Sequence, residues 1–319
     1  MQFINAEEVR QHLGWDSIID ALQAMFTSGC EAPVRHHHTM QLPGQADATM
    51  LIMPAWTAGQ YAGLKLVNVY PDNSLKNLPS IMGGYLLMDG ATGAPLAFMD
   101  AGELTARRTA GASALAARYL SREDASKLLI VGSGRMAMSL GLAHAKVRPI
   151  TEIQVWSRTL EKSEQTAAHY RAAGFNATVV NSLEEGVRWA DIVSCATMSE
   201  EPLVLGEWVQ PGTHIDLVGA FKPTMRETDD ALVSMASVFV DTRDGVLAEG
   251  GDLLIPIHNG TFNSDNIIAE LAELTRGDHP GRCSEDEITL FKSVGASLED
   301  LAAAIRCYES YQQASGSVL

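Results

Sequence analysis

The pattern of apolar and polar positions divides the chain into two stretches that predict different arrangements of helices and strands. Residues 5–26 carry apolar side chains at helical spacing with a break at Gly14, which predicts one or two helices. Apolar runs separated by turn residues then predict antiparallel strands, at residues 49–53, 61–69, 80–88 and 95–99. An alanine-rich segment, 103–120, predicts a long helix. The first stretch therefore has the pattern of an α+β domain.

Beyond residue 120, predicted strands and helices alternate. Leu128 to Val131 are all apolar, as expected for a parallel strand covered on both faces. Further strands are predicted at residues 153–156, 177–180, 191–196, 214–218 and 238–240, and helices at 160–173 and 183–189. The alternation predicts a Rossmann-type, doubly wound parallel sheet.

The last stretch, 291–308, ends in a predicted helix. We expect nothing in it to extend the parallel sheet, and we expect its helix to return to the first domain. The predicted organisation is a Rossmann-type domain at residues 116–295, inserted in an α+β domain made of residues 1–115 and 296–319.

A glycine turn follows the first parallel strand and opens a helix. Gly132-Ser133-Gly134-Arg135-Met136-Ala137 has the G-x-G-x-x-A spacing of a dinucleotide-binding turn. Gly132 permits the sharp turn, Gly134 lets the backbone approach a pyrophosphate, and Ala137 lets the helix pack close to the strand. The helix N-terminus favours the anion. An ordinary strand-turn-helix connection is the alternative, but the flanking strand and helix favour a dinucleotide cofactor.

The second parallel strand ends in Ser157-Arg158, where an NAD-preferring protein usually carries a carboxylate for the ribose 2′-hydroxyl. Arg158 with Ser157 can hold a 2′-phosphate through charge-assisted hydrogen bonds. We therefore predict NADPH as the cofactor, with NADH as the weaker alternative. The competing interpretation is that Arg158 is a solvated charge at a helix start.

Composition limits the class of protein. The chain has 319 residues, 46% of them hydrophobic, and a formal net charge of −16, which argues against a nucleic-acid partner. Four scattered cysteines, no signal peptide and no membrane-length apolar run favour a cytoplasmic protein with free thiols. His36, His37 and His38 are adjacent, but nothing completes a ligand set, so we expect no metal site.

Several motifs in order along almost the whole chain resemble the ornithine cyclodeaminase and mu-crystallin family. They are Gly63-Leu-Lys65 to Pro71, Asp89 to Gly93, Leu104 to Ala110, Gly132 to Ala137, Ala196-Thr197, Pro211-Gly212, Phe291 to Gly295, and Glu299-Asp-Leu301. The resemblance implies a homodimer in which both chain ends form a dimerisation and substrate domain.

The family's carboxylate-binding cations correspond to Arg35, Lys65 and Arg108. Such cations suit an amino or imino acid, since arginine can hold a carboxylate bidentately. Taken singly, each is more often a surface charge, and Lys65 could be an edge-strand lysine facing water. The resemblance also implies cofactor contacts for Thr109, Thr197, Ser293 and Gly295, although Thr109 and Thr197 could equally satisfy local backbone groups.

One position departs from the cyclodeaminases. They carry an aspartate where this chain has Phe221, which can accept neither a proton nor a hydrogen bond from an ammonium group. Ornithine cyclisation is therefore disfavoured, unless a neighbour such as Asp216 takes over the role. An apolar Phe221 suits the ring of a cyclic ketimine, so the resemblance is strongest to ketimine reductases.

The predicted function is NADPH-dependent reduction of 1-pyrroline-2-carboxylate to L-proline, or of 1-piperideine-2-carboxylate to L-pipecolate. Arg35, Lys65 and Arg108 would hold the substrate carboxylate, and Lys65 would supply or hold the imine proton, because a lysine desolvated near arginines has a lowered pKa. The alternatives are an alanine dehydrogenase-like enzyme, an ornithine cyclodeaminase, and a non-catalytic NADPH-dependent binder of small ligands. We expect no nucleic-acid or membrane partner.

Overall fold

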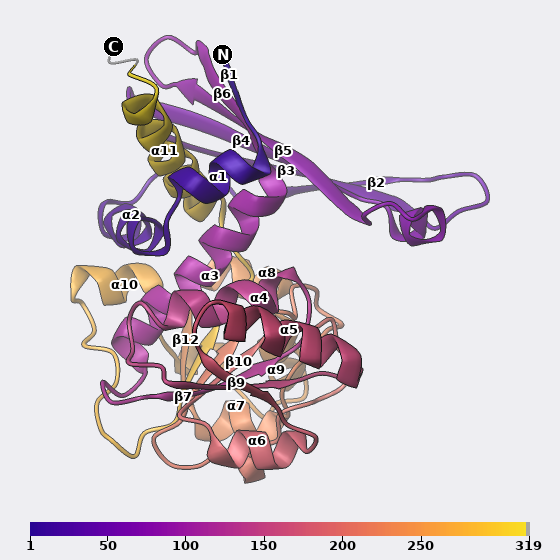
Figure 1. Cartoon of the computed structure of the whole chain (residues 1–319), viewed down its shortest axis with the longest axis vertical. Helices are drawn as coiled ribbons and strands as arrows, with labels where there is room; N and C mark the ends of the chain where they lie inside the picture. Colours follow the sequence, from indigo (N-terminus) through magenta and orange to yellow (C-terminus); the bar gives the residue numbers. More distant parts are fainter. Residues whose placement is uncertain (317–319) are drawn as a thin grey trace. The chain divides into compact units, whose positions relative to one another are not determined.

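The computed structural model describes residues 1–316, apart from the side chain of Ser74. Its contacts separate two compact units, one made of Met1–Arg108 with the segment that begins at Ala296, the other of Thr109–Gly295. The division falls between Arg108 and Thr109 of helix α3 (Ala101–Leu120), whereas the sequence pattern predicts it after residue 115 of the same helix. Figure 1 shows the elements of both units.

The N-terminal unit is built on a six-stranded sheet with the order β1-β6-β5-β4-β3-β2. Its strands pair antiparallel, except that β1 runs parallel to β6. Helix α11 packs on β3, β4 and β5, and it also contacts α1 and α2. The elements are β1 (Gln2–Ile4), α1 (Ala6–His12), α2 (Trp15–Ser28), β2 (His36–Met40), β3 (Ala48–Thr57), β4 (Tyr61–Val69), η1 (Pro71–Lys76), β5 (Ile81–Asp89), β6 (Pro95–Asp100) and α11 (Ser297–Ala314).

Local sequence explains the first two helices. Asn5 and Glu8 form a capping box at the start of α1, in which Asn5 Oδ1 accepts from the backbone and Glu8 accepts from Asn5 N. Gly14 is the N-cap of α2, which confirms the predicted break. The buried face of α2 carries Ile18, Leu22 and neighbouring apolar residues at helical spacing, as predicted.

The second unit is an eight-stranded sheet with the order β13-β12-β14-β11-β10-β7-β8-β9, in which every pairing is parallel. This confirms the doubly wound Rossmann-type sheet. Its elements are β7 (Lys127–Val131), α4 (Arg135–His144), β8 (Glu152–Trp156), α5 (Leu160–Ala172), β9 (Asn176–Val179), α6 (Leu183–Trp189), β10 (Ile192–Cys195), η2 (Gly206–Trp208), β11 (His214–Leu217), α7 (Asp230–Met235), β12 (Ser237–Val240), α8 (Arg243–Glu249), α9 (Gly251–His258), η3 (Ser264–Asn266), β13 (Ile267–Glu270), α10 (Leu271–Arg276) and β14 (Thr289–Lys292).

The expectation that nothing near the C-terminus extends the parallel sheet is wrong. β14 lies inside the sheet, hydrogen-bonded between β11 and β12. The strand is short and ends in Lys292, whose charge argues against a central strand from sequence alone. In the fold, Lys292 is fully buried and forms an ion pair with Asp252 Oδ2 at 3.0 Å. An acid that is 40 positions away in the sequence but adjacent in the fold therefore compensates the charge of the buried lysine.

Candidate active site

The strand order of the second unit reverses between β7 and β10, and ligands of such sheets bind beyond the strand ends at that point. Gly132 follows β7 with φ of +131°, a backbone conformation that favours glycine. A Cβ at Gly132 would lie 2.6 Å from the carbonyl oxygen of Ala196, which follows β10. The two loops at the reversal therefore touch, and they require this glycine.

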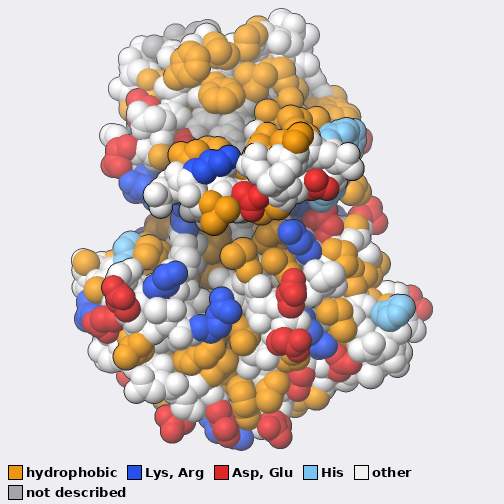
Figure 2. All heavy atoms as spheres, turned by 90° about the vertical axis from the view of Figure 1, so that its right-hand side faces the viewer, with side chains coloured by type: hydrophobic (Ala, Val, Ile, Leu, Met, Phe, Trp, Pro, Cys, Tyr) orange, Lys and Arg blue, Asp and Glu red, His pale blue; other side chains and the backbone are white. Residues whose placement is uncertain are grey.

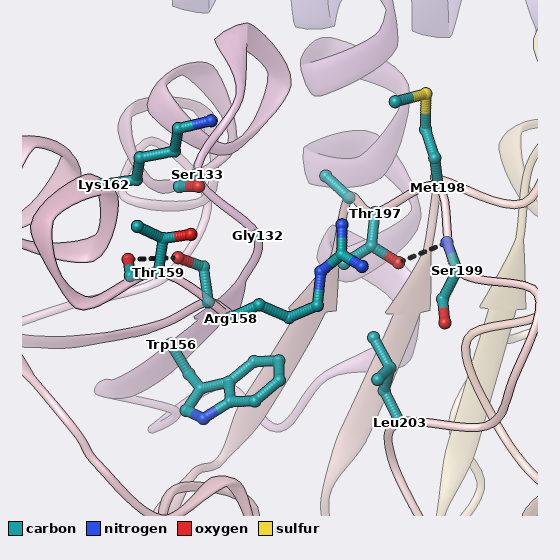
Figure 3. A pocket seen from close by; sticks show the side chains of 12 residues that line it. Gly132, Ser133, Trp156, Arg158, Thr159, Lys162, Thr197, Met198, Ser199 and Leu203 are labelled. Atoms are coloured by element: carbon teal, nitrogen blue, oxygen red, sulfur yellow. Dashed lines mark hydrogen bonds between the residues drawn. The ribbon is translucent and has the colours of Figure 1, made fainter.

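A pocket of about 170 Å³ opens beside Gly132. Residues that follow β7, β8 and β10 line it, together with the start of α5 and Leu203 (Figure 3). From the predicted cofactor contacts it brings together Gly132, Ser133, Ser157, Arg158 and Thr197. It also contains Trp156, Thr159, Lys162, Ala196, Met198 and Ser199.

The N-terminus of α4 has the features that a pyrophosphate requires. Gly134 is its N-cap and provides no side-chain cap, and a Cβ built there would have no heavy atom within 4 Å. Ala137 is buried, and its carbonyl oxygen accepts a hydrogen bond from Tyr170 on α5. Open space at Gly134 and close packing behind it fit a dinucleotide at this helix end.

Two cations line the pocket, and neither the Arg158 nor the Lys162 side chain has an ion pair or hydrogen bond with any residue that the structure describes. No carboxylate is among the lining residues. The Ser157 hydroxyl is already used, since it donates to Thr159 O at 3.0 Å and lies 2.8 Å from Ser163 Oγ. The sequence interpretation missed Lys162, although its spacing of four residues from Arg158 was a usable signal.

Thr197 is held at the pocket by a buried acid. Its backbone N–H and hydroxyl donate to Glu227 Oε1 at 2.6 and 2.9 Å, while Gly219 N donates to Oε2 at 2.7 Å. Burial, with a contribution from Asp252, raises the pKa of Glu227 to about 7. One carboxylate thus fixes the loops that follow both β10 and β11.

Other predicted cofactor contacts lie outside the pocket lining. Thr109 on α3 and Ser293 after β14 are buried, and Gly295 N donates to Asp241 Oδ2 at 2.7 Å. Arg135 is exposed and Met136 half-buried, both in the first turn of α4. Their roles stay predictions.

The N-terminal unit contains a buried group of charges. Lys65 lies on β4, a central strand rather than an edge, and its side chain is 2% exposed. Its Nζ lies 2.6 Å from Asp300 Oδ2 on α11. Arg108 contacts Asp300 Oδ1 through Nε at 3.0 Å and Glu299 Oε2 through Nη1 at 2.6 Å. The interpretation of Lys65 as a water-facing lysine is therefore wrong.

The electrostatic environment of Lys65 follows from these contacts. Burial lowers the pKa of Lys65 to about 8, and Arg108 and Arg35 act in the same direction, while Asp300 opposes them. The predicted lowering of this pKa is confirmed. Arg35 is half-buried.

Glu299 and Asp300 belong to the family motif, but no role is predicted for either from the sequence. Acids at the start of a helix are common because they interact favourably with its dipole, so their presence was no signal of burial.

Tyr85 also belongs to this group. It pairs with Lys65 across β4 and β5, and its hydroxyl lies above Gly63, where a Cβ would be only 1.9 Å away. The hydroxyl is buried without a hydrogen-bond partner among the described residues. Burial, with Asp300 and Cys30 acting in the same direction, raises the pKa of Tyr85 well above its ordinary value.

Asp216 cannot take the role of the aspartate that the cyclodeaminases carry at the position of Phe221. It is fully buried and accepts from Ser113 Oγ at 2.9 Å and Ser194 Oγ at 2.5 Å, with His144 Nε2 at 3.3 Å. Although burial opposes it, His144 and Ser194 hold the pKa of Asp216 below its ordinary value. Phe221 itself is half-buried after β11.

The histidine run lies exposed on β2. Within the described part of the chain, no three His, Cys, Asp or Glu residues form a group that could hold a metal ion. None of the helices described is long and apolar enough to span a bilayer.

A doubly wound parallel sheet with a Gly-x-Gly-x-x-Ala turn at its reversal defines the class as a dinucleotide-binding protein. The Ornithine cyclodeaminase/mu-crystallin family model matches residues 1–315, and the chain belongs to that family.

Individual relatives are similar over nearly their full length. The chain is 37% identical over 304 residues to a Delta(1)-pyrroline-2-carboxylate reductase of Paracoccus denitrificans, covering 95% of each chain. The structure of Thermococcus litoralis Delta(1)-pyrroline-2-carboxylate reductase with NADH and L-proline matches with a TM-score of 0.93 and 33% identity, over 99% of this chain and 98% of that one. An archaeal alanine dehydrogenase dimer with bound NAD matches with a TM-score of 0.91 and 30% identity, over 99% and 97%.

Proposed function

We propose that this chain reduces a cyclic imino acid, 1-pyrroline-2-carboxylate, to L-proline, with 1-piperideine-2-carboxylate as the six-membered alternative. The observation that carries this proposal is the buried group formed by Lys65, Arg108 and Asp300, with Arg35 near enough to act on Lys65. Similarity to a reductase whose structure holds NADH and L-proline supports the same substrate class.

The cations of this group suit a substrate that carries a carboxylate. Lys65 and Arg108 form direct ion pairs with Asp300 and Glu299, and Arg35 acts on Lys65 from the segment before β2. Arginine can hold a carboxylate through two parallel hydrogen bonds. Phe221 offers no acid to a second amine, and Asp216 is already engaged by Ser113 and Ser194, which argues against diamines.

The roles of the residues follow from their contacts. Arg108 and Arg35 would bind and orient the substrate carboxylate, while Lys65 would hold a proton for the imine nitrogen. The nicotinamide cofactor, when bound, supplies the hydride. Gly134, the turn around it and the pocket would hold that cofactor.

Arg158 and Lys162 support NADPH as the preferred cofactor. A 2′-phosphate would place its charge between two cations that have no partner among the described residues. NADH lacks this phosphate and would gain nothing from either side chain.

The substrate assay is NADPH oxidation with 1-pyrroline-2-carboxylate, beside pyruvate plus ammonia, and beside ornithine with NAD⁺. We expect rapid turnover of the cyclic imine alone. Ammonia-dependent oxidation with pyruvate would instead establish an amino-acid dehydrogenase, and tight NADPH binding without any turnover would establish a binding protein.

The cofactor assay compares Arg158→Ala and Lys162→Ala with Arg188→Ala, an exposed arginine on α6 outside the pocket. Each pocket variant should raise KM for NADPH about tenfold, because an exposed charge-assisted contact contributes about 1–1.5 kcal/mol, and should leave KM for NADH unchanged. Equal changes for both cofactors would contradict the proposed 2′-phosphate site.

A homodimer is part of the proposal. The sheet face opposite Lys65 is apolar and exposed, with Phe98 lying over Gly84, Leu66 opposite Gly84 and Phe3 6.2 Å from Phe98 between ring centroids. Figure 2 shows hydrophobic side chains gathered on the surface of the N-terminal unit. A patch of this kind marks an association surface, and the similar alanine dehydrogenase is a dimer.

A further inference from the structure

Asp300 connects two cations that come from different elements. It lies in the first turn of α11 and is fully buried. One carboxylate oxygen lies 2.6 Å from Lys65 Nζ on β4, and the other lies 3.0 Å from Arg108 Nε on α3. Among the described residues, Asp300 is the one ion-pair partner of Lys65.

The contribution of a buried ion pair to the free energy of unfolding is a weak explanation for the presence of Asp300. Apolar residues of similar volume often replace a buried ion pair without loss, and the buried residues that follow Asp300 on α11 are Leu301, Ala302 and Ala303. The position of the charge therefore points to a role for the side chain that it contacts.

Charged and titratable groups act on Lys65 from every element around it. Burial and the two arginines, Arg108 from α3 and Arg35 from the segment before β2, favour the neutral amine. Asp300 from α11 favours the ammonium. Beside it are Glu299, which contacts Arg108, and Tyr85 from β5, which in turn is influenced by Cys30 after α2.

We propose that Asp300 is a positioning residue that fixes Lys65 Nζ and keeps it protonated, so that Lys65 can protonate the imine nitrogen of the substrate. This inference rests on the proposed function. As the carbon of the C=N bond accepts a hydride, the π electron pair goes to nitrogen and takes the proton from Nζ. The neutral amine of Lys65 then recovers a proton from water, while Asp300 stays ionised throughout.

The test compares Asp300→Asn with Glu299→Gln, two isosteric changes at adjacent positions of α11. Both remove a carboxylate that contacts Arg108, but only Asp300 contacts Lys65. The rate of imine reduction by the wild-type enzyme should fall as pH rises through the Lys65 pKa of about 8. In Asp300→Asn the pH at which the rate falls should be lower by about one to three units. Glu299→Gln should weaken substrate binding and leave the pH at which the rate falls unchanged.

A second measurement does not depend on turnover. Titration of the lysine Cε NMR signals, with Lys65 assigned by its loss in Lys65→Met, should show the same displacement in Asp300→Asn and none in Glu299→Gln. Equal pH profiles and equal titrations for wild type and Asp300→Asn would overturn the inference.

Asp300→Glu covers the case in which Asp300→Asn does not fold. It keeps the charge but displaces it by one methylene, so kcat should fall while the pH profile stays near that of the wild type. A wild-type kcat in Asp300→Glu would remove the positioning role. If the wild-type enzyme reduces no cyclic imine, the proposed function fails, and the NMR titration still decides whether Asp300 controls Lys65.

Discussion

The burial of Lys65 gives the protein a pH-dependent stability whose sign and size follow from the structure. Burial, opposed by Asp300 and reinforced by Arg108, lowers the pKa of Lys65 from 10.5 to about 8. Between these values the unfolded chain keeps a proton on Lys65 that the folded protein has released. The unfolded state then binds more protons, so the free energy of unfolding rises with pH across this window.

The size of the effect comes from the shift itself. Each unit of pKa corresponds to about 1.4 kcal/mol, so the full contribution is about 3 kcal/mol. It is absent below about pH 8, where Lys65 is protonated in both states, and it is complete above the unfolded pKa of 10.5.

Urea unfolding of wild type and Lys65→Met across this pH range measures the contribution. Subtracting the curves cancels other groups that titrate at alkaline pH, and the difference should rise by about 3 kcal/mol. Lys76→Met removes an exposed lysine and serves as the control, with no such rise. Parallel curves for wild type and Lys65→Met would show that the buried Nζ keeps its ordinary proton affinity, which would refute the reasoning.

Three further outcomes are expected. Gly63→Ala should lower the free energy of unfolding by about 1–3 kcal/mol in chemical denaturation, because its Cβ would lie 1.9 Å from Tyr85 Oη, and an unchanged value would mean that the ring moves aside freely. Burial and Asp252 raise the pKa of Glu227 from 4.5 to about 7, so stability should be lost as pH rises through this range; urea melts of Glu227→Gln should lack that slope, and a retained slope would assign it to another group. Leu66→Lys should convert the proposed dimer to a monomer in light scattering, and a persisting dimer would place the interface elsewhere.

Local chemistry determined the parts of the fold that the sequence predicts correctly. The strand, turn and helix around Gly132 to Ala137 depend on residues within one short segment, since glycine conformations and helix periodicity act over a few positions. The break at Gly14 is another such case. Arg158 could be proposed as a cofactor contact for the same reason, because it follows the second predicted parallel strand.

The tertiary structure decided what depends on residues far apart in the chain. The central strand β14 ends in a buried Lys292 whose charge Asp252 compensates. Asp216 is engaged by Ser113, Ser194 and His144, which excludes it as a proton carrier.

Asp300 reaches Arg108 across 192 positions, and no periodicity in its own helix reports that contact. The sequence by itself determined which side chains carry charge. Only the fold decided which of those charges lose their water and therefore have to neutralise one another.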